Sequence, residues 1–177
     1  MLSKFRPWWH KFSARKFKGA GKWITPNQLS VLNLIFGTIA AYLIFIDRYI
    51  WAVVFITLSG FGDWFDGAIA RADQLGTPFG RVVDAVSDRF VDGFIFLGML
   101  PADWLAMPAL IITNVVSHVG VKEPNASKGL LERPERLILI SLALLFNQLR
   151  WGLITIIVLS SITLFMRMNS ARLIYKK

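Results

Sequence analysis

The chain has 177 residues, of which 55% are hydrophobic and only 18% charged, and it contains no cysteine. A soluble domain of this size carries fewer apolar and more charged residues, so the composition predicts a single-domain integral membrane protein, and the lack of cysteine excludes disulfides and thiol chemistry. The net charge of +9 would point to nucleic acid in a soluble protein, but these charges lie in loops between apolar runs, so we expect no nucleic-acid partner.

Residues 1–23 combine seven basic side chains with a regular aromatic pattern. Phe5, Trp8, Trp9 and Phe12 recur at the spacing that places them on one helix face. Basic residues around an aromatic face are typical of a helix that lies in the lipid headgroup layer. We therefore predict a juxtamembrane amphipathic helix in residues 1–23, with a disordered basic tail as the alternative.

Residues 24–177 contain six apolar runs separated by turn residues or polar loops, and we predict one all-α transmembrane domain with six spans. The predicted spans run from Leu29 to Ile46, from Tyr49 to about Ala70, from about Arg81 to Leu100, from Trp104 to Val119, from about Pro134 to Phe146 and from Trp151 to about Met166. A polar loop from Gly120 to Glu132 separates the fourth span from the fifth. The predicted fold is thus an integral membrane bundle of six helices, preceded by the amphipathic juxtamembrane helix.

The basic residues predict the orientation of this bundle. With six spans, only Arg48 and Arg150 among the 20 lysine and arginine residues fall on the side opposite the N-terminus. Cytoplasmic loops carry the excess of positive charge, so we predict that both termini lie in the cytoplasm. The end of the second span and the start of the third then lie on the cytoplasmic side of the cell membrane.

Four aspartates gather where the second span ends and the third begins. Asp63 and Asp66 are three residues apart, and Asp84 and Asp88 are four apart, so each pair shares one helix face. The glycine- and proline-containing stretch 76–80 can end one helix and start the next, so we expect the two helices to lie side by side. The four carboxylates would then converge on one point.

Such a cluster needs cations, because an unpaired aspartate at membrane depth costs about 2.5–3.5 kcal/mol. Oxygen-only ligands suit hard divalent ions, and two such ions balance the formal charge of four carboxylates. We therefore predict a site for two Mg²⁺ or Mn²⁺ ions. Ions clamped in this way can neutralise a diphosphate and stabilise both the attacking and the leaving oxygen of a phosphoryl transfer. Polar helix ends facing water are the alternative, which the number and spacing of the acids disfavour.

The spacing of these acids also resembles a known family. The string D-W-F-D-G-A-I-A-R, eight residues, and then G-R-V-V-D-A-V-S-D is similar to the motif of the CDP-alcohol phosphotransferases. The resemblance implies a homodimeric membrane enzyme that transfers a phosphatidyl-type group from a CDP-lipid to an alcohol and releases CMP. It implies that Asp63, Asp66 and Asp84 are metal ligands, and that Asp88 both contacts metal and acts as the general base.

The resemblance further implies which residues contact the CDP-lipid donor. Four of them open the first span and three belong to the acidic motif or the loop after it: Asn27, Gln28, Leu29, Ser30, Gly67, Arg71 and Thr77. Ser30 stands where we expect threonine, so the hydroxyl group is kept. Gly67 leaves room for a nucleotide to approach the helix backbone, although close helix packing is an equally ordinary role for a small residue in a membrane.

The acceptor is predicted from a second motif. The segment G-L-L-E-R-P-E-R-L that starts at Gly129 is similar to one found in family members that use inositol phosphate. A phosphorylated acceptor needs a basic pocket, and we assign to it the cytoplasmic basic residues Lys122, Lys128, Arg133, Arg136 and Arg167. Where those relatives carry a basic run such as K-A-R-A-E, this chain has V-G-V-K-E. Charge that merely sets the topology is the alternative role for the loop.

Two other functions remain open at this point. The same reaction with glycerol 3-phosphate as acceptor would make the chain a phosphatidylglycerophosphate synthase. A divalent-cation transporter would use the acids as an ion path, but a transporter favours acids spread over several spans rather than gathered on two. Asp73 and Asp92 are the remaining acids nearby, and we leave both outside the predicted site. The sequence does not distinguish a diacylglycerol donor from an archaeal diether donor.

Overall fold

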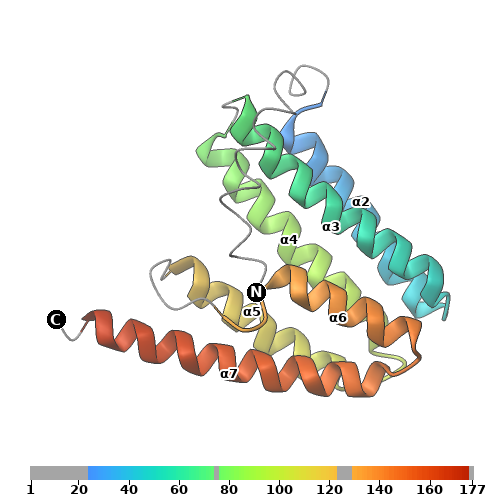
Figure 1. The fold of residues 1–177 in the computed structure, drawn as a ribbon. Coiled ribbons are helices and arrows are strands. Elements are labelled where there is room, and N and C mark those ends of the chain that lie inside the picture. Colours follow the sequence, from blue (N-terminus) through green and yellow to red (C-terminus); the bar gives the residue numbers. More distant parts are fainter. Residues whose placement is uncertain (1–23, 74–75, 123–128, 176–177) are drawn as a thin grey trace.

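The structure is a computed structural model that describes residues 24–73, 76–122 and 129–175. The predicted juxtamembrane helix in residues 1–23 lies outside these ranges. The described chain is all-helical, as predicted, and its six helices are α2 (Pro26–Phe45), α3 (Tyr49–Ala72), α4 (Pro78–Met99), α5 (Ala106–Lys122), α6 (Arg133–Leu145) and α7 (Leu149–Tyr175) (Figure 1).

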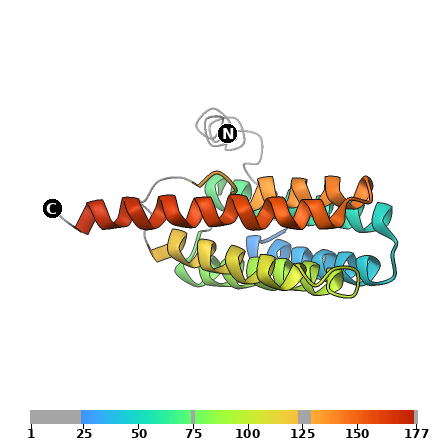
Figure 2. The same ribbon diagram turned by 90° about the horizontal axis from the view of Figure 1, so that it is seen from below.

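The six helices form a closed ring that does not follow chain order. Helix α2 packs on α3 and α4, α3 on α6, α6 on α7, α7 on α5, and α5 on α4 (Figures 1 and 2). We expected α3 and α4 to lie directly against each other. Instead both pack on α2 and share no extensive contact within the described residues, which leaves space between them for the side chains that they both carry.

Three of the helices are long and apolar enough to cross a membrane: Pro26–Phe45, Tyr49–Ala70 and Leu149–Leu173. Ala106–Gly120 is a shorter apolar helix. Helix α6 has 13 residues and is therefore about 20 Å long, less than the roughly 30 Å of a hydrocarbon core. The prediction of a helical membrane protein is confirmed in this coarser form: six helices, three of which have the length and composition of a span.

Local chemistry explains where the helices begin and end. Thr25 and Gln28 form a reciprocal capping box at the start of α2, and the Thr77 hydroxyl accepts a hydrogen bond from the Gly80 amide at the start of α4. The predicted start of the polar loop at Gly120 was wrong, and α7 extends beyond the approximate end predicted for the sixth span. Helix α5 continues through Gly120 to Lys122, and α7 continues past Met166 to Tyr175, because no proline interrupts either stretch.

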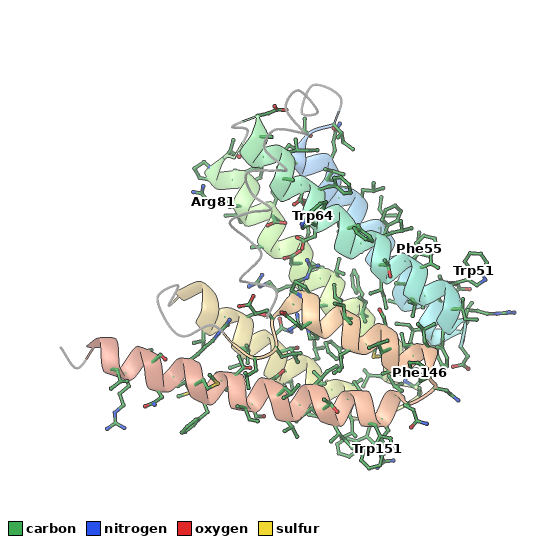
Figure 3. All side chains as sticks on the ribbon, in the orientation of Figure 1. Trp51, Phe55, Trp64, Arg81, Phe146 and Trp151 are labelled. Atoms are coloured by element: carbon green, nitrogen blue, oxygen red, sulfur yellow. The ribbon has the colours of Figure 1, made fainter. Side chains whose placement is uncertain are left out.

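The two hairpins α2–α3 and α6–α7 close with the same turn. Asp47 and Asn147 both adopt the left-handed conformation, with φ of 58° and 53°, which short polar side chains tolerate. Four residues beyond each of them lies an exposed tryptophan, Trp51 or Trp151 (Figure 3). Tryptophan is enriched where a membrane meets water, so this end of the bundle has the aromatic residues typical of an interface.

Small residues let α2 and α4 approach closely near the ends of both helices. A β-carbon at Gly98 of α4 would lie 3.1 Å from the Ala41 carbonyl carbon of α2. Such small-residue contacts are typical of membrane helices, whose association depends on close packing. Around them, Ile44, Ile95 and Phe96 are almost completely buried. The crossing of α2 and α4 therefore forms a rigid base for the acids nearer the other end.

Candidate active site and metal centre

The structure brings the predicted acids of α3 and α4 together. Asp63, Asp66 and Asp84 each offer a carboxylate oxygen that lies within 4.8 Å of the others. Asp66 is buried, with 5% of its surface exposed, and the other two are half-buried. Three carboxylates this close repel one another strongly in a poorly solvated site, so the arrangement favours a bound cation.

The geometry of this group fits a hard divalent ion. Magnesium binds oxygen at about 2.0–2.1 Å, so two oxygens on opposite sides of one ion lie about 4.2 Å apart. The observed separations of up to 4.8 Å need only small side-chain movements to reach that value. Oxygen-only ligation matches the preference of Mg²⁺ and Mn²⁺ over softer metals. The residues present therefore fit the divalent site predicted from the sequence.

Helix α2 supports one of these acids directly. The Ser30 hydroxyl lies 3.3 Å from Asp66 Oδ2 and 3.2 Å from the Pro26 carbonyl, and it can donate to either. Ser30 is buried, with 3% of its surface exposed. The residue that we predicted to contact the donor lipid thus also contacts a metal-site carboxylate from behind.

The fourth acid, Asp88, pairs with an arginine from the predicted acceptor motif. One terminal nitrogen of Arg133, at the start of α6, lies 2.7 Å from Asp88 Oδ1 and 2.9 Å from Asp63 Oδ2. Nε of Arg133 lies 3.6 Å from Asp92 Oδ1. Arg133 therefore joins α6 to both acid-bearing helices across the inside of the ring, and it supplies positive charge where we expect metal.

Asp92 belongs to the same network, although we left it outside the predicted site. Its carboxylate forms a buried ion pair with Arg136, of which 3% is exposed. The signal in the sequence was its position four residues after Asp88, which places both on one face of α4. With Asp92 included, five carboxylates and two guanidinium groups leave three negative charges, so the cluster still attracts cations.

A threonine of α7 holds the segment that leads to Arg133. The Thr163 hydroxyl accepts hydrogen bonds from the amides of Leu130 and Leu131, at 3.1 and 3.4 Å, and donates to the Leu159 carbonyl. Thr163 is completely buried. Sequence reasoning missed this role, because a threonine inside an apolar run looks like an ordinary part of a span.

The predicted donor residues occupy one end of the bundle and have varied local roles. Gln28 completes the capping box of α2, Thr77 caps α4, and Leu29 is buried in the core. Asn27 is exposed and faces Gly80, since a β-carbon there would lie 3.2 Å from its side-chain oxygen. Gly67 is half-buried on α3 beside Asp66, and the side chain of Arg71 lies outside the described part of the structure.

The predicted acceptor residues separate into two groups. Arg133 and Arg136 face the acids, as described above. Arg167 of α7 instead donates to the Val116 carbonyl of α5 at 2.6 Å, and Gly120 leaves the space that its guanidinium fills. The side chain of Lys122 and the whole of Lys128 lie outside the described residues. The structure thus brings two of the five predicted acceptor residues to the metal cluster.

Comparison with known proteins identifies the class. Residues 23–166 match the family model described as CDP-alcohol phosphatidyltransferase, and the chain belongs to this family of transferases. It is 32% identical to the archaetidylinositol phosphate synthase of Pyrococcus horikoshii, with 97% of each chain covered. It is 31% identical to the phosphatidylinositol phosphate synthase of Mycobacteroides abscessus, with 84% of this chain and 77% of the relative covered.

Solved structures share the fold. The phosphatidylinositol phosphate synthase of Mycobacterium tuberculosis with CDP-DAG bound superposes with a TM-score of 0.77 at 24% identity, covering 90% of this chain and 93% of the other. The same enzyme in complex with manganese and citrate gives a TM-score of 0.76 at 26% identity, covering 89% of this chain and 86% of the other. The first likeness concerns the fold alone. The second shows that a similar enzyme binds manganese.

Proposed function

We propose that this chain is a membrane phospholipid synthase that transfers a phosphatidyl-type group from a CDP-lipid to inositol phosphate and releases CMP. Family membership gives the transferase class. Two relatives, named archaetidylinositol phosphate synthase and phosphatidylinositol phosphate synthase, support the acceptor. The donor is CDP-diacylglycerol or CDP-archaeol. A cation transporter is disfavoured both by the family and by the position of the acids at one end of the bundle.

One observation carries the acceptor assignment. Arg133, from the motif that resembles those of inositol phosphate users, lies 2.7 Å from Asp88, the proposed general base. A phosphate held by that guanidinium would therefore sit beside the residue that must take the proton of the acceptor hydroxyl. A free alcohol such as inositol or serine would leave Arg133 without a phosphate partner. Glycerol 3-phosphate also carries a phosphate and remains the alternative acceptor.

The acids have distinct roles in the proposed reaction. Asp63, Asp66, Asp84 and Asp88 would hold two divalent ions, which neutralise the diphosphate of the donor when bound. Asp88 accepts the proton of the acceptor hydroxyl, whose oxygen forms a bond to the lipid-linked phosphorus. The bond between that phosphorus and the bridging oxygen breaks, and CMP leaves with the electron pair.

Donor and acceptor occupy different sets of residues in this proposal. The donor contacts the start of α2, the last turns of α3 and the start of α4, through Asn27, Gln28, Leu29, Ser30, Gly67, Arg71 and Thr77. The acceptor phosphate contacts Lys122, Lys128, Arg133, Arg136 and Arg167. The Thr163 contact supports this division, because it fixes the segment before Arg133 to α7 rather than to α2 or α3.

The membrane arrangement is also part of the proposal. Residues 24–177 form the transmembrane domain, with six spans, both termini cytoplasmic and the active site on the cytoplasmic side, and two chains form a homodimer. The acid cluster lies away from the exposed tryptophans Trp51 and Trp151 that flank the two hairpin turns, which supports a site near the other membrane face.

The test uses purified full-length protein, CDP-diacylglycerol or CDP-archaeol carrying a radiolabel in the lipid, and a panel of acceptors. We expect CMP and a labelled lipid product with inositol phosphate, and none with free inositol or serine. Turnover with glycerol 3-phosphate but not inositol phosphate would establish the alternative acceptor. No turnover with any alcohol, together with metal-ion flux into vesicles, would refute the transferase.

A further inference from the structure

Behind the metal cluster, α2 carries a buried asparagine whose function nothing above explains. Asn33 has 2% of its surface exposed and lies in the apolar stretch of α2 between Val31 and Phe36. A polar side chain at membrane depth needs hydrogen-bond partners, since lipid offers none. Its partners therefore indicate why the residue is there.

Both partners of the Asn33 side chain belong to the backbone of α3. With the amide oriented to satisfy its neighbours, its nitrogen donates to the Ser59 carbonyl at 3.3 Å and its oxygen accepts from the Asp63 amide at 2.8 Å. Ser59 and Asp63 are four residues apart, the pair whose carbonyl and amide a regular helix joins. The Ser59 hydroxyl in turn donates to the Asn33 carbonyl at 3.2 Å. Asn33 thus holds the backbone of a proposed metal ligand.

Gly62 makes this contact possible. A β-carbon at Gly62 would lie 2.9 Å from the Asn33 amide carbon and overlap the end of the side chain. The amide therefore packs directly on the α3 backbone at the residue before Asp63. Glycine weakens a helix interior by about 0.5–1 kcal/mol relative to alanine, and the close approach of Asn33 is a reason for its presence here.

The contact between Asn33 and α3 matters because Arg133 attracts the Asp63 carboxylate from the side opposite Asn33. The Asp63 carboxylate lies 2.9 Å from Arg133 of α6. It also belongs, with Asp66 and Asp84, to the group of carboxylates that could hold an ion. On the α2 side, Ser30 supports Asp66 and Asn33 supports Asp63, in an antiparallel register. Helix α2 therefore contacts both proposed ligands of α3, Asp63 and Asp66, on one side. Arg133 of α6 attracts Asp63 on the opposite side.

We propose that Asn33 is a positioning residue of the metal centre, which fixes the Asp63 backbone so that its carboxylate reaches the ion shared with Asp66 and Asp84. The inference rests on the metal site of the proposed function. Groups that orient a ligand typically change metal affinity 10–100-fold when removed. Asn33→Leu keeps the branched shape of the side chain but removes both hydrogen bonds to α3.

The experiment measures Mn²⁺ binding to the purified, full-length protein by electron paramagnetic resonance, without lipid or acceptor. We expect the Mn²⁺ dissociation constant of Asn33→Leu to rise at least about tenfold. The matched control is Asn114→Leu, because Asn114 is a half-buried helical asparagine that donates only within its own helix, to the Leu110 carbonyl at 3.1 Å. This control should bind Mn²⁺ as the wild type does.

A second readout separates positioning from simple loss of stability. The melting temperature in EDTA should fall for both asparagine variants, whereas Mn²⁺ affinity should fall only for Asn33→Leu. If that variant does not fold, Asn33→Ser provides the same measurement, since serine is too short to reach Asp63. Equal Mn²⁺ affinity in the folded Asn33 variant and the control would overturn this inference alone. A wild type that binds no Mn²⁺ would overturn both this inference and the proposed metal site.

Discussion

The Arg133 guanidinium lies 2.7 Å from Asp88 Oδ1 and so joins the proposed acceptor site to the proposed general base. The same nitrogen lies 2.9 Å from Asp63. The basic group that should bind the acceptor phosphate therefore also neutralises acids that should bind metal. An acceptor phosphate that draws Arg133 away would leave these carboxylates free for ions and for the acceptor proton.

Loss of Arg133 should affect acceptor and metal in opposite directions. Hydrogen bonds to charged groups contribute roughly 1.5–3 kcal/mol, so Arg133→Ala should raise the KM for inositol phosphate about ten- to a hundredfold. CDP-lipid binding should remain nearly unchanged. Because the variant removes a positive charge from the cluster, Mn²⁺ should bind more tightly, which titration calorimetry can measure. Arg172→Ala, at an exposed position near the end of α7, is the control and should change neither. An unchanged KM would exclude Arg133 from the acceptor site.

Substitution of the proposed base should stop the chemistry but not donor binding. Asp88→Asn keeps the size of the side chain and removes its ability to accept the hydroxyl proton, so CMP release should fall below detection. Binding of CDP-lipid, measured by fluorescence with a labelled lipid, should persist. Since Asp88 is also a proposed ligand, Mn²⁺ occupancy is measured in the same samples. Substantial CMP release by this variant would assign the base to another residue.

A crystal soaked in Mn²⁺ should show two anomalous peaks between α3 and α4, beside Asp63, Asp66, Asp84 and Asp88. Asp66→Ala should remove at least one peak, because Asp66 belongs to the group whose oxygens lie within 4.8 Å. Asp103→Asn, a change in the loop at the other end of the bundle, should leave both peaks in place. No peak in the wild type would refute the metal centre.

The buried pair of Arg136 and Asp92 should matter for stability as well as for the acceptor. Removing one partner of a buried ion pair leaves the other uncompensated and costs about 3–5 kcal/mol, so Arg136→Met should lower the melting temperature strongly. The double variant with Asp92→Leu should recover much of this loss, since it removes both charges. If the single variant melts like the wild type, the pair makes no net contribution to stability.

The close crossing of α2 and α4 provides a test of the fold. Gly98→Ala places a β-carbon against the Ala41 carbonyl group, and such overpacking costs about 1–3 kcal/mol, so thermal unfolding should occur at a lower temperature. Gly93→Ala is the control on the same helix, because a β-carbon there meets no atom within 4 Å. Equal melting temperatures would contradict the close approach of the two helices.

Much of this arrangement follows from the sequence, because regular spacing carries the information. Apolar runs between turn residues predicted the helices, and the intervals of three and four residues placed the acids on shared faces. The partners of those acids were harder to predict from the sequence. Asn33, Asp92 and Thr163 act through contacts between residues far apart in the chain, as with Leu130 and Thr163. Sequence periodicity describes one helix at a time, so it does not show which helices become neighbours.

The packing of α3 and α4 was likewise not predictable from the sequence. Their short connection suggested direct packing, yet both rest on α2, and the acids meet across the space between. Within the described residues, the two ends of the bundle are therefore held by different forces. Aliphatic and aromatic side chains such as Ile44 and Phe96 hold the base, whereas carboxylates and guanidinium groups close the end that carries the proposed active site. Salt and chelators should loosen that end first, and heat or detergent the other.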